Sequence, residues 1–253
     1  MRFASLGSGS RGNGTLVEYD HTCLLIDCGF GLKETEQRLA RLGKDPAALS
    51  AILITHEHAD HIKGVGPLAR KYTLPVWMTY GTWSPERLGH VPALHFFNSH
   101  ESFAIEALQV RPFPVPHDAH EPSQFVFDNG NRRLGLLTDT GCSTPHIEQM
   151  LANCDALLLE CNHDSAMLAN GPYSISLKHR VGGGLGHLSN EQAARLLSRL
   201  PHDRLQHIVA MHISQNNNTP ALARQALCAA IDCAAERITL ADQDGGFGWR
   251  ALA

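Results

Sequence analysis

The chain has 253 residues, 43% of them hydrophobic, and a formal net charge of −4. This length and composition are enough for one sizeable hydrophobic core, so we expect a single domain over residues 1–253. The negative charge argues against a protein that coats nucleic acid by bulk electrostatics, and the longest apolar runs are too short to span a bilayer. Because the N-terminal residues also lack the apolar stretch of a secretory signal, we expect a cytoplasmic protein without a membrane partner.

The seven cysteines lie in apolar contexts such as CLLIDC and include no CxxC pair. This pattern predicts small buried side chains in a reducing compartment, not a disulfide framework or a zinc ribbon. The 16 histidines are the unusual feature of the composition. Histidines are common both on surfaces and in cores, so only those spaced like metal or catalytic ligands relative to other such residues are candidates for a site.

In chain order, the sequence first predicts a strand meander over Arg2–Leu6, Thr15–Tyr19 and Cys23–Asp27. The first connecting loop, GSGSRG at Gly7–Gly12, matches the GxGxxG pattern of a dinucleotide-binding fingerprint. That fingerprint opens a helix, whereas the residues after this loop alternate like a strand, so we do not expect nucleotide binding there. A helix over Leu32–Leu42 follows and ends at a glycine.

A buried strand over Ala51–Ile54 leads into the stretch THEHADHIKG, ahead of a helix from about Ile62 to Tyr72. Alternate residues of an extended loop project to the same side, so two histidines can hold one ion while the aspartate and the last histidine face a second. Imidazole and carboxylate ligands together suit zinc, manganese or iron. The four potential ligands, all within six residues, are His56, His58, Asp60 and His61.

The remaining elements are strands and two helices with clear N-terminal signals. Ser189 begins a capping box ahead of AARLLSRL, and Thr219-Pro220 precedes ALARQALCAAIDC. Strand-rich halves that each end in helices, without strict βαβ alternation, predict an α/β (α+β) fold of stacked sheets with outer helices. The further strands are predicted over residues 103–111, 124–127, 133–138, 156–160, 206–211 and 237–241.

The stretch THEHADHIKG resembles the HxHxDH signature of the metallo-β-lactamase superfamily. The resemblance implies a four-layer αβ/βα sandwich of two mixed β-sheets flanked by helices. It also implies a centre of two divalent metal ions, Zn²⁺ or Mn²⁺ with Fe²⁺ as a further option, that share a hydroxide. Four more residues at the ends of β-like runs fit the superfamily pattern, namely Asp27, His117, Asp139 and His212.

The resemblance also assigns a role to each of these residues. Asp139 would bridge both ions, and Asp27 would orient a ligand or its loop without binding metal. Asp60 and Asp139 also belong to the predicted catalytic set. One ion would be held by His56, His58 and His117, and the other by Asp60, His61 and His212.

Five other stretches narrow the reaction. GHLSNEQAARLL and HISQNNNTP resemble ribonuclease Z-type phosphodiesterases, while ECNHD, NGPYSISLKHR and GSGSRGN more closely resemble the WalJ/YycJ branch, whose members are regarded as nucleases acting from the 5′ end of DNA. This implies that the shared hydroxide attacks phosphorus and that His187 acts as general acid or phosphate ligand. DNA is favoured over RNA as the substrate. The alternatives are a hydrolase of RNA or of a small phosphodiester, a thioesterase or lactonase of the same fold, and a metal-binding regulatory protein without turnover.

Four residues are candidates for contacts with the substrate. Lys178 and Arg180 are predicted in a loop that can fold over a phosphate, and Arg11 in the glycine loop offers a similar contact. The helix amides from Ser189 onward favour an anion. His163 follows a strand at the edge of the predicted site, where we expect it to support other residues.

Overall fold

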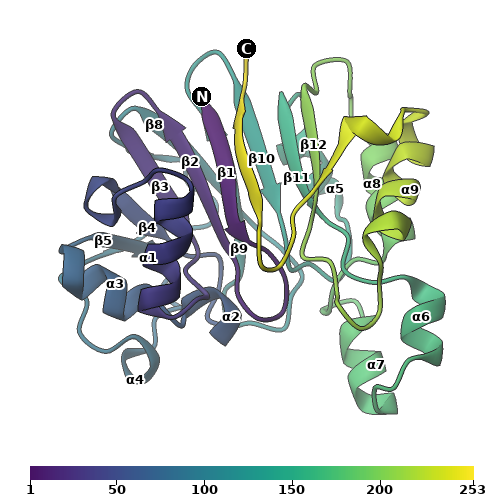
Figure 1. Cartoon of the computed structure of the whole chain (residues 1–253), viewed down its shortest axis with the longest axis horizontal. Coiled ribbons are helices and arrows are strands. Elements are labelled where there is room, and N and C mark those ends of the chain that lie inside the picture. Colours follow the sequence, from purple (N-terminus) through teal and green to yellow (C-terminus); the bar gives the residue numbers. More distant parts are fainter.

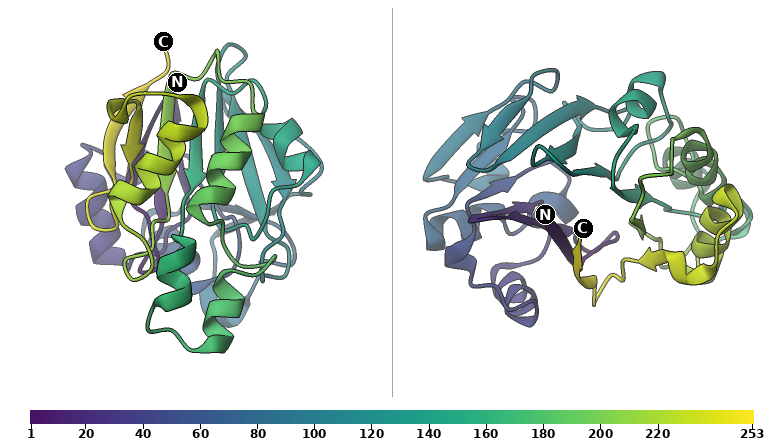
Figure 2. Two further views of the ribbon diagram at one scale, coloured as in Figure 1. Left: turned by 90° about the vertical axis from the view of Figure 1, so that its right-hand side faces the viewer. Right: turned by 90° about the horizontal axis from the view of Figure 1, so that it is seen from above.

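The structure is a computed structural model that describes residues 1–253. Two seven-stranded mixed β-sheets pack face to face, and helices cover the outer face of each sheet (Figures 1 and 2). This is the four-layer αβ/βα sandwich that the resemblance implies, so the predicted fold class is confirmed.

The first sheet is built mainly from the N-terminal part of the chain. Its strand order is β14-β1-β2-β3-β4-β5-β6, with an antiparallel meander over β1 to β3 and parallel pairing from β3 to β6. Its strands are β1 (Arg2–Gly7), β2 (Gly14–Tyr19), β3 (Thr22–Ile26), β4 (Ala51–Leu53), β5 (Pro75–Met78), β6 (Ala93–Phe96) and β14 (Phe247–Ala251). The helices on this side are α1 (Leu32–Arg41), α2 (Ala59–Ile62), α3 (Val65–Tyr72) and α4 (Pro85–Leu88), with a 3₁₀ turn η1 (Pro46–Ala48).

The second sheet has the order β13-β12-β11-β10-β9-β8-β7. Its strands β7 to β10 are antiparallel, and β10 to β13 are parallel. The strands are β7 (Phe103–Ile105), β8 (Leu108–Pro114), β9 (Ser123–Asp128), β10 (Arg133–Leu137), β11 (Ala156–Glu160), β12 (His207–Met211) and β13 (Ile238–Leu240). The helices on this side are α5 (Pro145–Leu151), α6 (Ser165–Asn170), α7 (Ile175–Val181), α8 (Asn190–Arg199) and α9 (Pro220–Ile231), with a 3₁₀ turn η2 (Ala235–Arg237).

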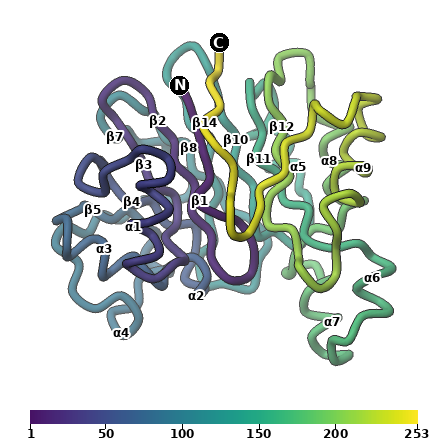
Figure 3. Tube along the Cα trace, viewed as in Figure 1, coloured from purple at the N-terminus to yellow at the C-terminus, as the bar shows by residue number.

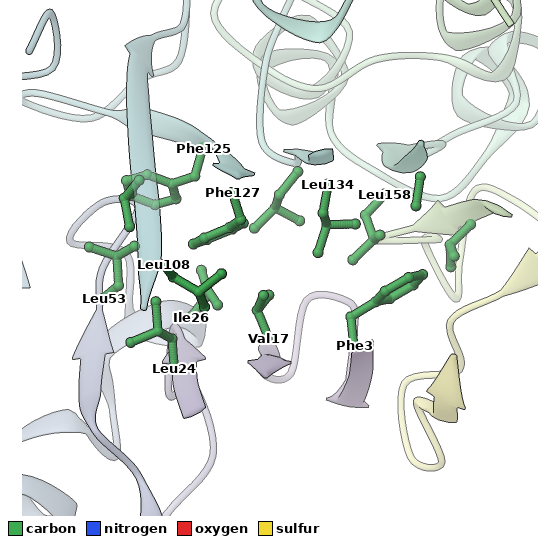
Figure 4. Close-up of a cluster of buried hydrophobic side chains, with 14 of the residues drawn as sticks. Phe3, Val17, Leu24, Ile26, Leu53, Leu108, Phe125, Phe127, Leu134 and Leu158 are labelled. Carbon is green, nitrogen blue, oxygen red and sulfur yellow. The ribbon is translucent and has the colours of Figure 1, made fainter. Parts of the chain in front are cut away.

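Three clusters of buried apolar side chains fill the three spaces between the four layers. The cluster between the sheets includes Phe3, Leu24, Phe127 and Leu158, which point toward one another in Figure 4. Successive residues of a strand face opposite sides, so Leu25 leaves this cluster and packs under the helices of the first sheet instead. The apolar runs of the sequence are therefore buried on both faces, as expected of parallel strands covered by helices.

Both predicted helix starts are confirmed. The Ser189 side chain accepts a hydrogen bond from the Gln192 N–H at the start of α8, and the Gln192 side chain completes the capping box. Thr219 caps α9 in the same way through the Leu222 N–H. Such caps satisfy backbone donors that the first turn of a helix leaves unpaired.

Two predicted elements are each divided in the structure. The helix predicted over 62–72 is interrupted at Gly64, whose N–H donates to the Cys28 carbonyl at 2.7 Å. A Cβ on Gly64 would lie 2.1 Å from the Phe30 carbonyl oxygen, so the chain passes too close for a larger residue. The strand predicted over 103–111 is a hairpin of β7 and β8, which turns at Glu106 with a φ of 50°.

Other parts of the chain were predicted incorrectly or not at all. Strands β5, β6 and β14 were missed, as were helices α5 and α6. The predicted loop carrying Lys178 and Arg180 is helix α7, capped by the Ser174 side chain, which accepts from the Leu177 N–H. None of the helices combines the length and apolar character that a membrane-spanning segment needs.

The two ends of the described chain lie side by side at one edge of the first sheet (Figure 3). Strand β14 pairs antiparallel with β1, and the Leu252 N–H donates to the Met1 carbonyl at 2.9 Å. The carboxyl ends of β3, β4, β8, β10, β11 and β12 lie at the opposite edge of the sandwich, where the loops that follow them converge (Figure 1).

Candidate active site

A group of three histidines forms the first half of the site. The ring centroids of His56, His58 and His117 lie 4.6 to 4.9 Å apart, and one ligand atom from each lies within 4.8 Å of the others. Hydrogen bonds fix the rings: His58 Nε2 contacts the Asp118 carbonyl at 3.1 Å, and His117 Nδ1 contacts the Gly186 carbonyl at 3.0 Å. The remaining nitrogens, His58 Nδ1 and His117 Nε2, face each other at 3.3 Å.

The buried Nε2 atom of His56 has no hydrogen-bond partner. Its other ring nitrogen contacts the Thr55 hydroxyl at 2.9 Å, which leaves Nε2 directed at the other two histidines. An unpaired polar atom in a buried site is unfavourable unless a ligand satisfies it. A divalent metal ion held by three imidazoles would do so, and this donor set fits zinc, manganese or iron.

The second half of the site surrounds Asp139. His61 Nε2 lies 3.2 Å from Asp139 Oδ2 and 3.5 Å from Asp60 Oδ2. On the other side, His212 Nδ1 lies 3.0 Å from Asp139 Oδ1. Asp139 also lies within the ligand-atom group of His56, so its carboxylate stands between the two halves. The fold thus brings together all seven donors that the sequence singled out, from four separate segments of the chain.

The protonation states of these donors follow from burial and from their neighbours. Burial and the nearby His61 lower the pKa of His56 well below its ordinary value, which keeps the imidazole in its neutral, metal-binding form. Burial alone would raise the pKa of Asp139, but His212 and His61 outweigh it and hold that pKa well below its usual range. Burial likewise opposes protonation of His61, but Asp139, Asp27 and Asp60 raise its pKa well above 6.5. Metal binding at His61 therefore displaces a proton.

Asp27 binds Thr55 and His61 and does not line the cavity described below. Its Oδ2 atom accepts hydrogen bonds from the Thr55 hydroxyl and from His61 Nδ1, each at 2.8 Å. The Thr55 N–H donates to the other carboxylate oxygen at 2.9 Å. These bonds fix the His61 ring with Nε2 facing Asp139, which is how an outer carboxylate orients a metal-binding histidine.

Three of the charged residues have a left-handed backbone conformation. The φ angles of Asp27, Asp139 and His212 are 59°, 49° and 51°. Each residue directly follows or closely follows the end of a strand, β3, β10 or β12, where this conformation turns the chain sharply. Non-glycine residues in this region cost about 1–3 kcal/mol each and are found where the surroundings fix the conformation, as at active sites.

His187 faces the donors from the second half of the chain, and Glu160 holds it there. Glu160 is fully buried, and its Oε1 atom lies 2.8 Å from His187 Nδ1. Its Oε2 atom accepts the N–H groups of Thr140 and Leu188 at 3.1 and 3.0 Å. Burial would lower the pKa of His187, but Glu160 and then Asp139 outweigh it and raise the pKa to about 9. These contacts favour the protonated form of His187, whose side chain lines the cavity.

Glu160 is the functional residue that the sequence reading did not assign. It ends the apolar run ALLLE, just as Asp27 follows LLI and Asp139 follows LLT. The position of its carboxylate at the end of a buried strand was the sequence feature that could have indicated a role for Glu160. Its partner His187 lies 27 positions further on, so only the fold brings the two together.

The four predicted substrate contacts lie in different places. Arg180 lines the cavity, and its Nε atom donates to Asp118 Oδ2 at 2.5 Å. Lys178 points away, donating to the Ala169 carbonyl at 2.7 Å, and Arg11 pairs with Asp244 at 2.7 Å. Neither Lys178 nor Arg11 lines the cavity.

Two amides at the start of α8, where an anion was predicted to bind, are bonded within the protein. The Ser189 N–H donates to the Gln192 side chain and the Asn190 N–H to the His163 carbonyl, each at 2.8 Å, so neither amide is available to a ligand. His163 is buried outside the cavity, beside Ser189, and its Nδ1 atom has no partner.

Four of the seven donors line an open cavity of about 740 Å³ between the two halves of the chain, namely His58, Asp60, Asp139 and His212. This volume is in the range of sites that hold small molecules or parts of larger ones. One side is formed by the loop after β4 with α2 and α4, and the other by α7 and the loops after β11 and β12. Among its lining residues are Asp60, Lys63, Arg87, Asp139, Tyr173, Leu177, Arg180, His187 and His212.

The fold and this site define a metal-dependent hydrolase. The chain belongs to the beta-lactamase superfamily, because the family profile described as "Beta-lactamase superfamily domain" matches residues 22–213. The family resemblance drawn from the sequence motifs is confirmed.

Two named relatives and one solved structure are similar to this chain. Exodeoxyribonuclease YycJ of Bacillus anthracis is 37% identical over 236 residues, which cover 92% of this chain and 89% of that protein. Ribonuclease Z of Mycobacterium marinum is 25% identical over 267 residues, covering 98% and 90%. The crystal structure of the metallo-beta-lactamase fold protein YhfI from Bacillus subtilis superposes with a TM-score of 0.76 at 17% identity, covering 97% of each chain, which shows the shared fold.

Proposed function

We propose that this protein is a nuclease that uses two divalent metal ions, Zn²⁺ or Mn²⁺, to hydrolyse DNA from its 5′ end. The observation that carries the proposal is the Glu160–His187 pair, which directs a protonated imidazole at two adjoining sets of metal ligands. The similarity to an exodeoxyribonuclease over most of both chains supports DNA as the substrate.

In this proposal His56, His58 and His117 hold one ion, Asp60, His61 and His212 hold the other, and Asp139 bridges them. Two bound divalent ions would supply an activated water at neutral pH and neutralise the charge of a phosphodiester. Asp27 and Thr55 keep the His61 ring in place, and Asp118 and Gly186 do the same for His58 and His117.

In this proposal His187 and Glu160 assist the departure of the leaving group. As an oxygen of water adds to phosphorus, the bond between phosphorus and the 3′ oxygen of the terminal nucleotide breaks. That oxygen is a strong base and needs a proton, which His187 Nε2 is placed to give while Glu160 stabilises the charged ring beforehand. The products are a terminal nucleotide with a free 3′ hydroxyl and a shortened strand with a 5′ phosphate.

A ribonuclease Z-like activity on RNA is the second candidate, because the chain also resembles a ribonuclease Z along nearly its whole length. A positioned acid suits the strongly basic leaving oxygen of either nucleic acid. The same acid is not needed for a thiolate, which leaves readily, so a thioesterase ranks below both.

Metal content and substrate specificity test the proposal together. The purified protein, reconstituted with Zn²⁺ or Mn²⁺, is assayed on DNA and RNA labelled at either end and on bis-(p-nitrophenyl) phosphate. We expect two metal ions per chain and 5′-directed cleavage of DNA that is lost in Asp139→Asn and His187→Ala. His21→Ala, which changes an exposed histidine in the β2–β3 turn, is the matched control.

The outcomes separate the alternatives. Phosphodiester cleavage that does not depend on Asp139 and His187 would remove the basis of the proposal. Faster cleavage of RNA than of DNA would favour the ribonuclease Z-like activity, and one metal ion per fully active chain would contradict the binuclear centre.

A further inference from the structure

The segment containing α6 and α7, residues 165–190, projects from the body of the protein (Figures 1 and 2). Several of its residues line the cavity. It contains no aspartate or glutamate, although the whole chain has a net charge of −4. Three consecutive residues of α7, Lys178, His179 and Arg180, are basic or ionisable. The segment therefore places no negative charge beside the cavity that would repel a nucleic acid backbone.

The same segment exposes apolar side chains. Ile175 and Leu185 are 77% and 57% exposed, and Leu177 is 36% exposed. Grouped apolar exposure beside a site usually marks a binding surface. Three apolar or aromatic residues of the segment, Tyr173, Leu177 and Val181, line the cavity itself, with Leu177 and Val181 one helical turn apart on α7.

Tyr173 is the only aromatic side chain other than histidine that lines the cavity. It is half-buried, and its hydroxyl accepts a hydrogen bond from Asn216 Nδ2 at 3.1 Å, which ties the ring to the loop after β12. An aromatic ring that is fixed before a ligand arrives loses little freedom on binding. Stacking of such a ring against nucleobases tolerates any sequence, because every base has a flat face.

The other side of the cavity provides cations. Lys63, directly after α2, lines the cavity and has no ion-pair partner in the structure. Arg87 of α4 also lines the cavity, and its Nη1 atom donates to the Glu57 carbonyl at 2.7 Å, which holds the guanidinium in place. An apolar wall thus faces a cationic one, with the metal ligands between them.

We infer that the segment 165–190 binds the terminal nucleoside of the strand, with Tyr173 stacked on its base, while Lys63 and Arg87 bind backbone phosphates of the strand that continues. This inference rests on the proposed function. His187 lies at the end of this same segment and protonates the 3′ oxygen of the departing nucleotide, so that nucleotide must lie on the Tyr173 side. A cavity of about 740 Å³ admits a nucleotide but not a double helix, so the end of the strand enters unpaired.

The test compares Tyr173→Ala and Tyr173→Phe on two single-stranded DNA oligonucleotides that differ only at the 5′ end. One carries a normal terminal nucleotide, and the other carries a terminal sugar without a base. On the normal substrate, Tyr173→Ala should raise KM roughly 5- to 150-fold, the range given by stacking of one base. On the abasic substrate it should change KM little. Tyr173→Phe keeps the aromatic face and loses only the bond to Asn216, so it should raise KM on the normal substrate by less than Tyr173→Ala does. Tyr80→Ala, at an exposed tyrosine outside the cavity, is the matched control.

The outcomes distinguish this inference from the proposed function. Equal losses on both substrates would show a structural role for Tyr173, and no loss on the normal substrate would show that the base is bound elsewhere. Either result overturns the inference and leaves the phosphodiesterase proposal standing, provided that wild-type protein cleaves bis-(p-nitrophenyl) phosphate. Failure of the wild type on every phosphodiester would overturn both. The melting temperature of each variant checks that it folds.

The cationic side has its own test. Lys63→Ala should raise KM equally for the normal and the abasic oligonucleotide and lower the slope of log KM against log salt by about 0.7, the value for one phosphate contact on a single strand. Lys71→Ala, which removes an exposed lysine paired with Glu36 on the outer helices, should change neither quantity. An unchanged salt dependence in Lys63→Ala would overturn the assignment of phosphate binding to this side.

Discussion

Replacing Glu160 by glutamine tests how the site supplies a proton. Glutamine has nearly the same shape, and its side-chain oxygen can still accept the Thr140 and Leu188 N–H groups that now bond Glu160. Its NH₂ group would then face His187 Nδ1, which favours the neutral imidazole. The substitution therefore removes the charge that keeps His187 protonated while leaving the local packing in place.

The expected size of the effect follows from the pKa of His187. With Glu160 present the pKa is about 9, so roughly 90% of the rings are protonated at pH 8; at the ordinary value of 6.5 roughly 3% would be. The turnover of DNA by Glu160→Gln should thus fall about 30-fold at pH 8 and approach the wild-type rate at pH 6.

The assay measures kcat between pH 5.5 and 9.5 on end-labelled DNA and on bis-(p-nitrophenyl) phosphate. Nitrophenolate is a weak base that leaves without a proton, so Glu160→Gln should lose little activity on the second substrate. The metal content of the variant is measured as a control, because Glu160 lies within reach of the metal ligands. An equal loss on both substrates, or a loss on DNA that does not vary with pH, would refute the role assigned to the Glu160–His187 pair.

The same pair makes a prediction for the metal-free protein. A raised pKa means that the contribution of His187 to stability is fully present below pH 6.5 and is lost as the pH rises through about 9. The full shift corresponds to roughly 3 kcal/mol at most. The melting temperature of chelator-treated protein should therefore fall between pH 6.5 and 9.5 and should fall less in Glu160→Gln; equal slopes in the two proteins would contradict this account.

Three further predictions concern metal binding and the cysteines. Chelation should abolish phosphodiester cleavage and lower the melting temperature, and added Zn²⁺ or Mn²⁺ should restore both. A metal that binds only the folded chain stabilises it by about 4 kcal/mol at 1,000 times its Kd. An unchanged melting temperature would count against a metal centre. Asp27→Asn, which weakens the hold on His61, should reduce metal affinity by about 10- to 100-fold in a competition titration, and wild-type affinity would contradict that role. Three of the seven cysteines should react with a thiol reagent at pH 8 in the folded protein, and all seven should react after denaturation. The other four are buried, which raises the pKa of their thiols, for example that of Cys28 to about 12. Rapid labelling of any of these four would contradict their burial. The four unreactive cysteines are Cys23, Cys28, Cys154 and Cys161.

The positions of the candidate metal ligands and of Asp27 could be predicted because these residues have local signals. Asp27, Asp139 and His212 follow short apolar runs, and the cluster at 56–61 follows another. Parallel strands place such residues at one edge of a sheet, so a sequence pattern becomes a spatial cluster once the strands are known. The family resemblance then supplied the grouping of the ligands into two sets.

Contacts that depend on packing between distant segments could not be predicted in the same way. The bond between Glu160 and His187 requires β11 and the loop before α8 to meet, and neither segment carries a sign of the other. Strand β14 lies at the edge of its sheet and is partly polar, so it lacks the apolar run that marks the central strands. The bond between the Ser189 amide and the Gln192 side chain could also be predicted from the sequence, because it is part of the capping box that predicts the helix.

The left-handed backbone at Asp27, Asp139 and His212 has a consequence for protein engineering. Glycine adopts this conformation without steric cost, so at these three positions the residue that best suits the backbone is one that cannot bind or orient a metal. A glycine there would relieve the backbone but would also remove a side chain that pairs with buried neighbours such as His61, so a stability screen without metal would report the balance of these two effects and not the state of the site. Libraries built to stabilise this protein should therefore be screened with metal present, so that stability and catalysis are selected together.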